Sequence, residues 1–103
     1  MLVKEVYSIA RELPDSERFG LVSQIQRAAV SVPSNIAEGY SRKGTSEYLR
    51  FLSMVYGSAS ELETQLIIIE QIYPWIDTSK AQSLLMEVQK MLYSLMGKLR
   101  TFS

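Results

Sequence analysis

Four segments of the chain carry apolar residues at alternating spacings of three and four positions, which is typical of helices that bury one stripe of side chains. The third segment shows the pattern most clearly, through Tyr48, Leu52, Val55, Ala59, Leu62, Leu66, Ile69 and Tyr73. No segment alternates with a period of two for long enough to predict a strand. The pattern therefore predicts an all-α protein with helices at about 2–13, 16–40, 46–73 and 78–101.

Short breaks separate these helices, and each break carries residues that end or begin helices. Pro14 and Asp15 separate the first pair, residues 39–44 with a glycine at each end separate the second, and Pro74 separates the third. We expect Asp15 and Asp77 to cap the second and fourth helices. Loops this short make neighbouring helices antiparallel, so we expect an up-down-up-down four-helix bundle.

Pro33 lies inside the second predicted helix, where it removes one backbone hydrogen bond. The apolar spacing resumes in phase at Ile36, which indicates that the helix continues beyond the proline. We therefore expect a kink between Ser31 and Asn35 rather than a break.

The predicted first helix is much shorter than the third. At about 1.5 Å per residue the first spans roughly 18 Å and the third roughly 42 Å, so the first covers only the half of the bundle near Pro14 and Pro74. At the other end, apolar side chains that lack a fourth wall would form an oligomer interface. These side chains are Ile36, Tyr40, Tyr48, Leu52, Leu95 and Leu99. Alternatively, a longer first helix in the native protein would fill the gap.

The second and third predicted helices also carry a polar stripe beside the apolar one. Folding them back on each other places Arg27 opposite Glu61 and Glu38 opposite Arg50. We hypothesise two cross-helix ion pairs, which would fix register and orientation more than they add stability. The expected cross-helix polar network consists of Gln24, Arg27, Ser31, Asn35, Glu38, Arg50 and Glu61. The alternative is an ordinary solvated face, although a mixture of Ser, Asn and Gln with so few lysines favours partial burial.

Composition removes most catalytic and metal chemistry from consideration. The chain of 103 residues suits a single domain, residues 1–103, and contains neither cysteine nor histidine. This excludes disulfides, thiolate and imidazole metal ligands, a histidine general base and a di-iron site of the Glu-x-x-His type. We therefore expect no catalytic residue, no cofactor and no metal. The lack of cysteine fits a reducing compartment, and no signal peptide or membrane span is indicated, so we expect a cytoplasmic protein.

The net charge is zero, but the charges are unevenly distributed. Residues 51–87 carry five carboxylates and one lysine, whereas basic residues gather around the turn after the second predicted helix. There Tyr40, Arg42, Lys43, Tyr48 and Arg50 interleave basic side chains with aromatic rings, a pattern that suits nucleic-acid contact at Tyr40, Arg42, Lys43 and Arg50. The alternative is a solvated turn with tyrosines at the edge of the core. Several copies in one assembly would let such weak sites act together.

Two strings of residues resemble the 23S rRNA intervening-sequence protein family, whose members are also called four helix bundle proteins. The first string runs from Arg27 to Gly39 as RAAVSVPSNIAEG and follows Phe19-Gly20-Leu21 and Gln24; the second comprises Gly57-Ser58 and Glu61 to Leu66. The resemblance implies a four-helix bundle that assembles into a homopentameric ring. It also implies kinship with the accessory variability protein of diversity-generating retroelements, which binds nucleic acid and a reverse transcriptase.

The chain departs from that family in two ways. Family members usually have more residues before the position of Leu2, so the first helix here is short. The retroelement relatives are strongly basic, whereas this chain is neutral. We expect a non-enzymatic, self-assembling bundle that associates with RNA or a nucleoprotein. The alternative is a protein–protein adaptor that docks a partner on exposed apolar helix faces.

Overall fold

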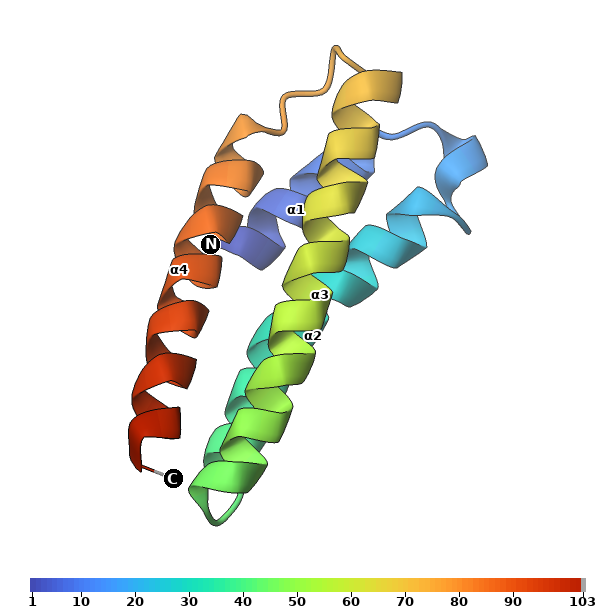
Figure 1. The fold of residues 1–103 in the computed structure, drawn as a ribbon. Coiled ribbons are helices and arrows are strands. Elements are labelled where there is room, and N and C mark those ends of the chain that lie inside the picture. Colours follow the sequence, from blue (N-terminus) through green and yellow to red (C-terminus); the bar gives the residue numbers. More distant parts are fainter. Residues whose placement is uncertain (103) are drawn as a thin grey trace.

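The structure is a computed structural model and describes residues 1–102. Its elements are α1 (Leu2–Glu12), the short 3₁₀ turn η1 (Asp15–Glu17), α2 (Leu21–Ser41), α3 (Thr45–Ile72) and α4 (Ser79–Phe102) (Figure 1). No strand occurs in that part of the chain. The predicted all-α class with four helices is confirmed, and the bounds of α1, α3 and α4 lie within one residue of the predicted ones.

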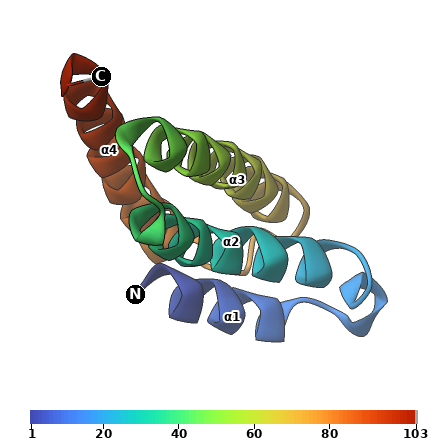
Figure 2. The ribbon, with the colours of Figure 1, turned by 90° about the horizontal axis from the view of Figure 1, so that it is seen from below.

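The helices form a bundle in which each one contacts two others. In Figure 1 the chain descends along α2, rises along α3 and descends again along α4. Both α1 and α3 contact α2 and α4, whereas no contact joins α2 to α4 within residues 1–102. Figure 2 shows this arrangement from below, with α1 running beside α2. Because α2 and α4 lie diagonally across the bundle, the space between them depends on α1 and α3 for cover.

The start of α2 differs from the prediction. The helix begins at Leu21 rather than at residue 16, and the preceding residues form η1, in which the Glu17 amide bonds the Pro14 carbonyl at 2.9 Å. Gly20 interrupts the helical conformation, with φ −113° and ψ −107°. Asp15 therefore lies in η1 and does not cap α2, whose first turn has no side-chain cap. The predicted continuity through Pro33 is confirmed, since α2 runs without a break to Ser41.

Asp77 acts at the start of α4, as the sequence predicts. Its Oδ1 atom accepts hydrogen bonds from the Ser79 amide at 2.9 Å and from the Ser79 hydroxyl at 2.7 Å. These two bonds hold the pKa of the Asp77 carboxyl below its usual value, because they favour the ionised form. The carboxylate thus satisfies one of the orphan amides that every helix start presents.

The turn between α2 and α3 requires glycine at two positions. Gly44 has φ +96°, a backbone conformation that side chains with a Cβ rarely adopt. Gly39 is buried, and a Cβ placed on it would lie 2.6 Å from the Cβ of Phe51. The α2 and α3 backbones therefore approach each other closely at this end of the bundle.

The core divides into two clusters along the long axis of the molecule, which measures 46 Å. The upper cluster in Figure 1 contains residues of all four helices, including Val6 and Ile9 from α1. The lower cluster contains Val32, Leu52 and buried residues of α3 and α4, but none from α1. This division follows from length, since α1 with 11 residues spans about 16 Å and α3 with 28 residues about 42 Å. One end of the bundle is thus built from three helices.

Candidate functional site

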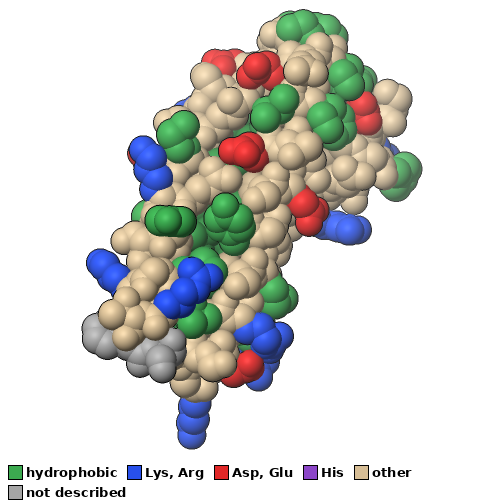
Figure 3. Space-filling model, in the orientation of Figure 1, with side chains coloured by type: hydrophobic (Ala, Val, Ile, Leu, Met, Phe, Trp, Pro, Cys, Tyr) green, Lys and Arg blue, Asp and Glu red, His purple; other side chains and the backbone are tan. Residues whose placement is uncertain are grey.

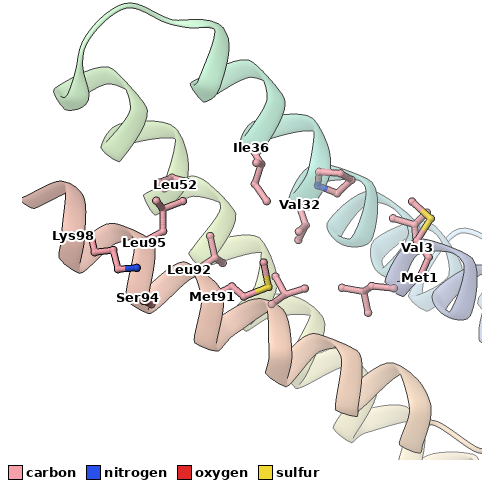
Figure 4. Close-up of a pocket in the computed structure, with 13 residues that line it drawn as sticks. Met1, Val3, Val32, Ile36, Leu52, Met91, Leu92, Ser94, Leu95 and Lys98 are labelled. Atoms are coloured by element: carbon pink, nitrogen blue, oxygen red, sulfur yellow. The ribbon is translucent and has the colours of Figure 1, made fainter.

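An apolar groove lies between α2 and α4, beside the N-terminal end of α1 (Figure 4). Its volume is about 600 Å³, and Leu52 of α3 is part of its wall. Figure 4 shows Val32 and Ile36 of α2 facing Leu92 and Leu95 of α4 across it. The lining residues are Met1, Leu2, Val3, Val32, Pro33, Ile36, Leu52, Val88, Met91, Leu92, Ser94, Leu95 and Lys98, of which only Ser94 and Lys98 are polar. A groove with so few polar groups is a candidate site for contact with another apolar surface.

The groove contains some of the residues predicted for an oligomer interface. Ile36 and Leu95 line it and are half-buried. Leu52 also lines it but is fully buried, so it belongs to the core and offers no exposed surface, which corrects the prediction. The correction has a simple cause: α2, α3 and α4 close around Leu52 without help from α1.

Other predicted interface residues lie outside the groove. Tyr40 is 78% exposed at the end of α2, where its ring meets that of Tyr48 edge-on with centroids 6.0 Å apart. Leu99 and Tyr48 are partly buried, and each packs against the lower cluster. Sequence reasoning missed Met91, which is 71% exposed and lines the groove. Its spacing of three positions from Val88 and four from Leu95 was the available signal.

A polar cleft lies between α2 and α3, and only these two helices contribute to it. Its volume is about 510 Å³, and it is lined by Gln24, Arg27, Ala28, Ser31, Ser58, Glu61 and Gln65. Near its centre the hydroxyls of Ser31 and Ser58 lie 2.8 Å apart. Asn35 donates from Nδ2 to the Ser31 hydroxyl at 2.8 Å and to the Ser31 carbonyl at 2.9 Å. Five residues of the predicted network therefore lie in or beside one cleft, and these are Gln24, Arg27, Ser31, Asn35 and Glu61.

The predicted ion pair between Glu38 and Arg50 is wrong. Arg42 takes the Glu38 carboxylate at 2.7 Å, and Arg50 bonds Glu47 through Nε at 2.9 Å and Nη2 at 3.2 Å. Each arginine pairs with a carboxylate three or four residues earlier in the chain, because such a partner is easier to reach than one on another helix. The Arg50 hydrogen bond lowers the pKa of the Glu47 carboxyl.

The predicted ion pair between Arg27 and Glu61 also does not form, although both side chains line the polar cleft. Neither side chain makes a hydrogen bond or an ion pair with any residue in the range 1–102. The cleft therefore holds one cation and one anion that lack partners.

Gln65 lies on the polar stripe that the sequence predicts for the third helix, although the predicted network does not include it. Its side chain is only 8% exposed and lines the cleft, and its Oε1 atom has no hydrogen-bond partner. A buried carbonyl oxygen without a partner is unfavourable, and such groups are rare in folded proteins. Gln65 falls one turn after Glu61 on α3, and this helical spacing places both side chains on the same polar stripe.

The basic turn, consisting of Tyr40, Arg42, Lys43 and Arg50, lies at the lower end of the molecule in Figure 1. In Figure 3, basic side chains gather mostly toward this end of the visible face and acidic ones mostly toward the other. The carboxylates of Glu38 and Glu47 offset the charges of Arg42 and Arg50. Lys43 is exposed and makes no ion pair with residues 1–102.

The two guanidinium groups of the basic turn flank one aromatic ring. Arg42 Cζ lies 5.3 Å and Arg50 Cζ 4.6 Å from the centroid of the Phe51 ring, whose side chain is buried. Cation–π contacts of this kind hold both arginines against the protein surface. The turn therefore presents Lys43 and Tyr40 as its freely accessible groups.

Within the described part of the chain, no three or more carboxylate side chains come together in a group that could hold a metal ion. No helix there is long and apolar enough to cross a membrane.

The fold and these surfaces define a small four-helix protein with an apolar groove, a polar cleft and a basic turn. The chain belongs to the 23S rRNA-intervening sequence protein family, whose model matches residues 1–97. The match includes every residue of the polar cleft and all residues of the apolar groove except Lys98. A comparison with curated proteins found no match.

Proposed function

We propose that the protein is a non-enzymatic helical bundle that assembles with copies of itself through the apolar groove. The groove carries this proposal, because its almost wholly apolar lining gains free energy when another chain covers it and removes it from water. Neither cofactor nor metal takes part, and the cytoplasm is the compartment that we propose for it.

A second copy can supply an apolar surface of its own to the groove. Met86 and Tyr93 are exposed on α4, and Tyr56 is exposed on α3, so one molecule carries exposed apolar side chains outside its groove. A contact between two different surfaces of the same protein forms a closed ring when the rotation from one copy to the next is a whole-number fraction of 360°. The resemblance to the family favours a ring of five copies.

Molar mass by light scattering at micromolar concentration tests the assembly. We expect a mass several times the 11.7 kDa of one chain, and a lower mass for Met91→Asp, which places a charge in the groove at an exposed position. Phe19→Asp is the matched control, since Phe19 is an exposed apolar residue that neither lines the groove nor belongs to the surface of Tyr56, Met86 and Tyr93. A parent protein of 11.7 kDa would overturn the proposal, as would a Met91→Asp variant of unchanged mass.

We further propose that the assembly associates with RNA or a nucleoprotein through the basic turn. Lys43 and Tyr40 support this, because one offers an unpaired charge and the other a largely exposed ring on which a base can stack. A single copy offers few contacts, whereas an assembly repeats the turn and gains affinity through several weak contacts.

Binding of a structured RNA at low and high salt tests this second proposal. We expect binding that weakens as salt rises and is lost in Lys43→Glu with Arg42→Glu. Lys90→Glu is the control, because Lys90 is an exposed lysine of α4 away from the turn. If the protein assembles but binds no RNA at low salt, a protein–protein adaptor that docks a partner's helix on the groove becomes the better explanation.

A further inference from the structure

The outer face of the α2–α3 pair holds unsatisfied polar groups of complementary chemistry. Arg27 on α2 is a donor and Glu61 on α3 an acceptor, and both line the polar cleft without a partner. Gln65 Oε1 is a second acceptor without a partner, and its side chain is more than nine-tenths buried. Because Glu61 and Gln65 are four residues apart on one helix, their side chains lie on the same side of α3.

An apolar strip borders the cleft on α3. Met54, Ile68 and Ile72 are exposed, and their spacing places them on the same side of α3 as Glu61. Gly57 lies between them, and a Cβ built there would meet no atom within 4 Å. Exposed apolar residues beside one buried acceptor and two unpaired charged side chains favour a protein interface over an ordinary solvated helix face.

We propose that this outer face packs against the same face of a second copy. In this contact Arg27 of each copy inserts between Glu61 and Gln65 of the other. The inference rests on the proposed self-assembly but uses a surface that shares no residue with the apolar groove. A two-fold contact of this kind is self-complementary, because each copy brings one cation and one anion to the same patch.

The chemistry of the three residues fits this pairing. A guanidinium carries five N–H donors in a planar fork, so it can bond a carboxylate and still donate to a neighbouring carbonyl oxygen. Arg27 of a second copy would satisfy Glu61 and Gln65 Oε1 together. The Ser31–Ser58 contact and Gly57 keep the centre of the face low, which lets two helix pairs approach closely.

A second copy fits this cleft better than a nucleic acid. The cleft holds one positive and one negative side chain, so it has no excess of positive charge to attract phosphates. A second copy presents opposite charges at the same spacing by symmetry. A small zwitterion would also match the charges but would leave the apolar strip uncovered.

Two charge-reversed chains, studied separately and mixed, test the proposal by light scattering. Arg27→Glu gives a face with two anions and Glu61→Arg a face with two cations, so each alone should lose the contact and raise the dissociation constant about tenfold or more. An equimolar mixture should recover the mass of the parent protein, because the two faces then complement each other. Both residues are exposed, so both variants should keep the parent's far-ultraviolet circular dichroism. Glu63→Arg is the control, since Glu63 is exposed on α3 but does not line the cleft.

Each other outcome has a definite meaning. Unchanged mass in both variants would overturn the cleft contact. A second pattern would also overturn it. In that pattern the mass of each single variant falls and mixing does not restore it, whereas the double variant Arg27→Glu with Glu61→Arg has the parent's mass. This result would indicate an ion pair within one chain. A groove variant Met91→Asp that loses mass while both charge variants keep it would overturn the cleft contact and leave the proposed function standing. The reverse result would support the cleft contact and overturn assembly through the groove.

Discussion

The phenol of Tyr73 donates a hydrogen bond to Glu17 Oε2 over 2.5 Å, joining the end of α3 to the η1 turn. The Tyr73 ring also meets Trp75 edge-on, with centroids 5.6 Å apart. Tyr73 and Glu17 are 56 positions apart in sequence, so the hydrogen bond between them fixes the path of the chain before α2 begins. The bond to Glu17 raises the pKa of Tyr73, because it favours the protonated phenol.

We predict that Tyr73→Phe lowers stability at neutral pH and removes a pH dependence on the alkaline side. A raised folded-state pKa contributes stability that is complete below the unfolded value of about 10 and is lost as the pH rises through the folded pKa. Urea unfolding of both proteins at pH 7 and at increasing alkaline pH measures the difference. Tyr93→Phe is the control, because Tyr93 is exposed and bonds no residue within 1–102. If the unfolding free energies of the parent and of Tyr73→Phe change with pH in the same way, the prediction is contradicted.

We predict that Asp77→Ala lowers the melting temperature above the acid range and has little effect in strong acid. The lowered pKa of Asp77 gives stability that is present above the unfolded value of about 3.9 and is lost as the pH falls through the folded pKa. Thermal unfolding of parent and variant at several pH values between neutral and strongly acidic tests this. Asp15→Ala should change little, since Asp15 does not cap a helix.

We predict that Gly39→Ala destabilises the protein by about 1–3 kcal/mol, because the new methyl group would meet the Cβ of Phe51 at 2.6 Å and force α2 away from α3. Gly57→Ala is the opposite case, since nothing lies near its Cβ position and alanine favours the helix by about 0.5–1 kcal/mol. Denaturant unfolding at a concentration where the chain is monomeric compares the two. If both variants change the free energy of unfolding equally and in the same direction, the contact at Gly39 is not tight.

We predict a coupling between Ser31 and Ser58 of about 0.5–1.5 kcal/mol, because their hydroxyls share one hydrogen bond at 2.8 Å in a half-buried position. The measurement is a double-mutant cycle with Ser31→Ala, Ser58→Ala and the double variant. Additive losses of unfolding free energy would mean that water replaces the bond without penalty. A cycle on Ser53 and Ser60, whose hydroxyls form no hydrogen bond with residues 1–102, provides the baseline.

The sequence predicts the helices well because burial of an apolar stripe decides where they form. Leu62, Leu66 and Ile69 recur at helical spacing and are fully buried, and the bounds of α3 follow from them. The start of α2 could not be read in the same way. The spacing of Val22 and Ile25 predicts the helix, but the backbone conformation of Gly20 determines where it begins. The spacing of apolar residues gives no information about that conformation.

The interaction surfaces are only partly predictable from spacing. The short α1 does foretell an uncovered end, and Ile36 and Leu95 line the resulting groove. Spacing cannot say that Leu52 is sealed by three helices, or that Arg42 takes Glu38 before Arg50 can reach it. Such outcomes depend on competition between several partners within reach, which only coordinates resolve.

The end of the bundle that α1 does not reach has a thermal consequence for any assembly that covers it. Burial of apolar surface draws its driving force mainly from water entropy near room temperature, and that force weakens on cooling. An assembly held by Met91, Ile36 and Leu95 would therefore come apart in the cold and form again on warming. Preparations kept on ice would contain smaller particles than the same preparations at about 37 °C.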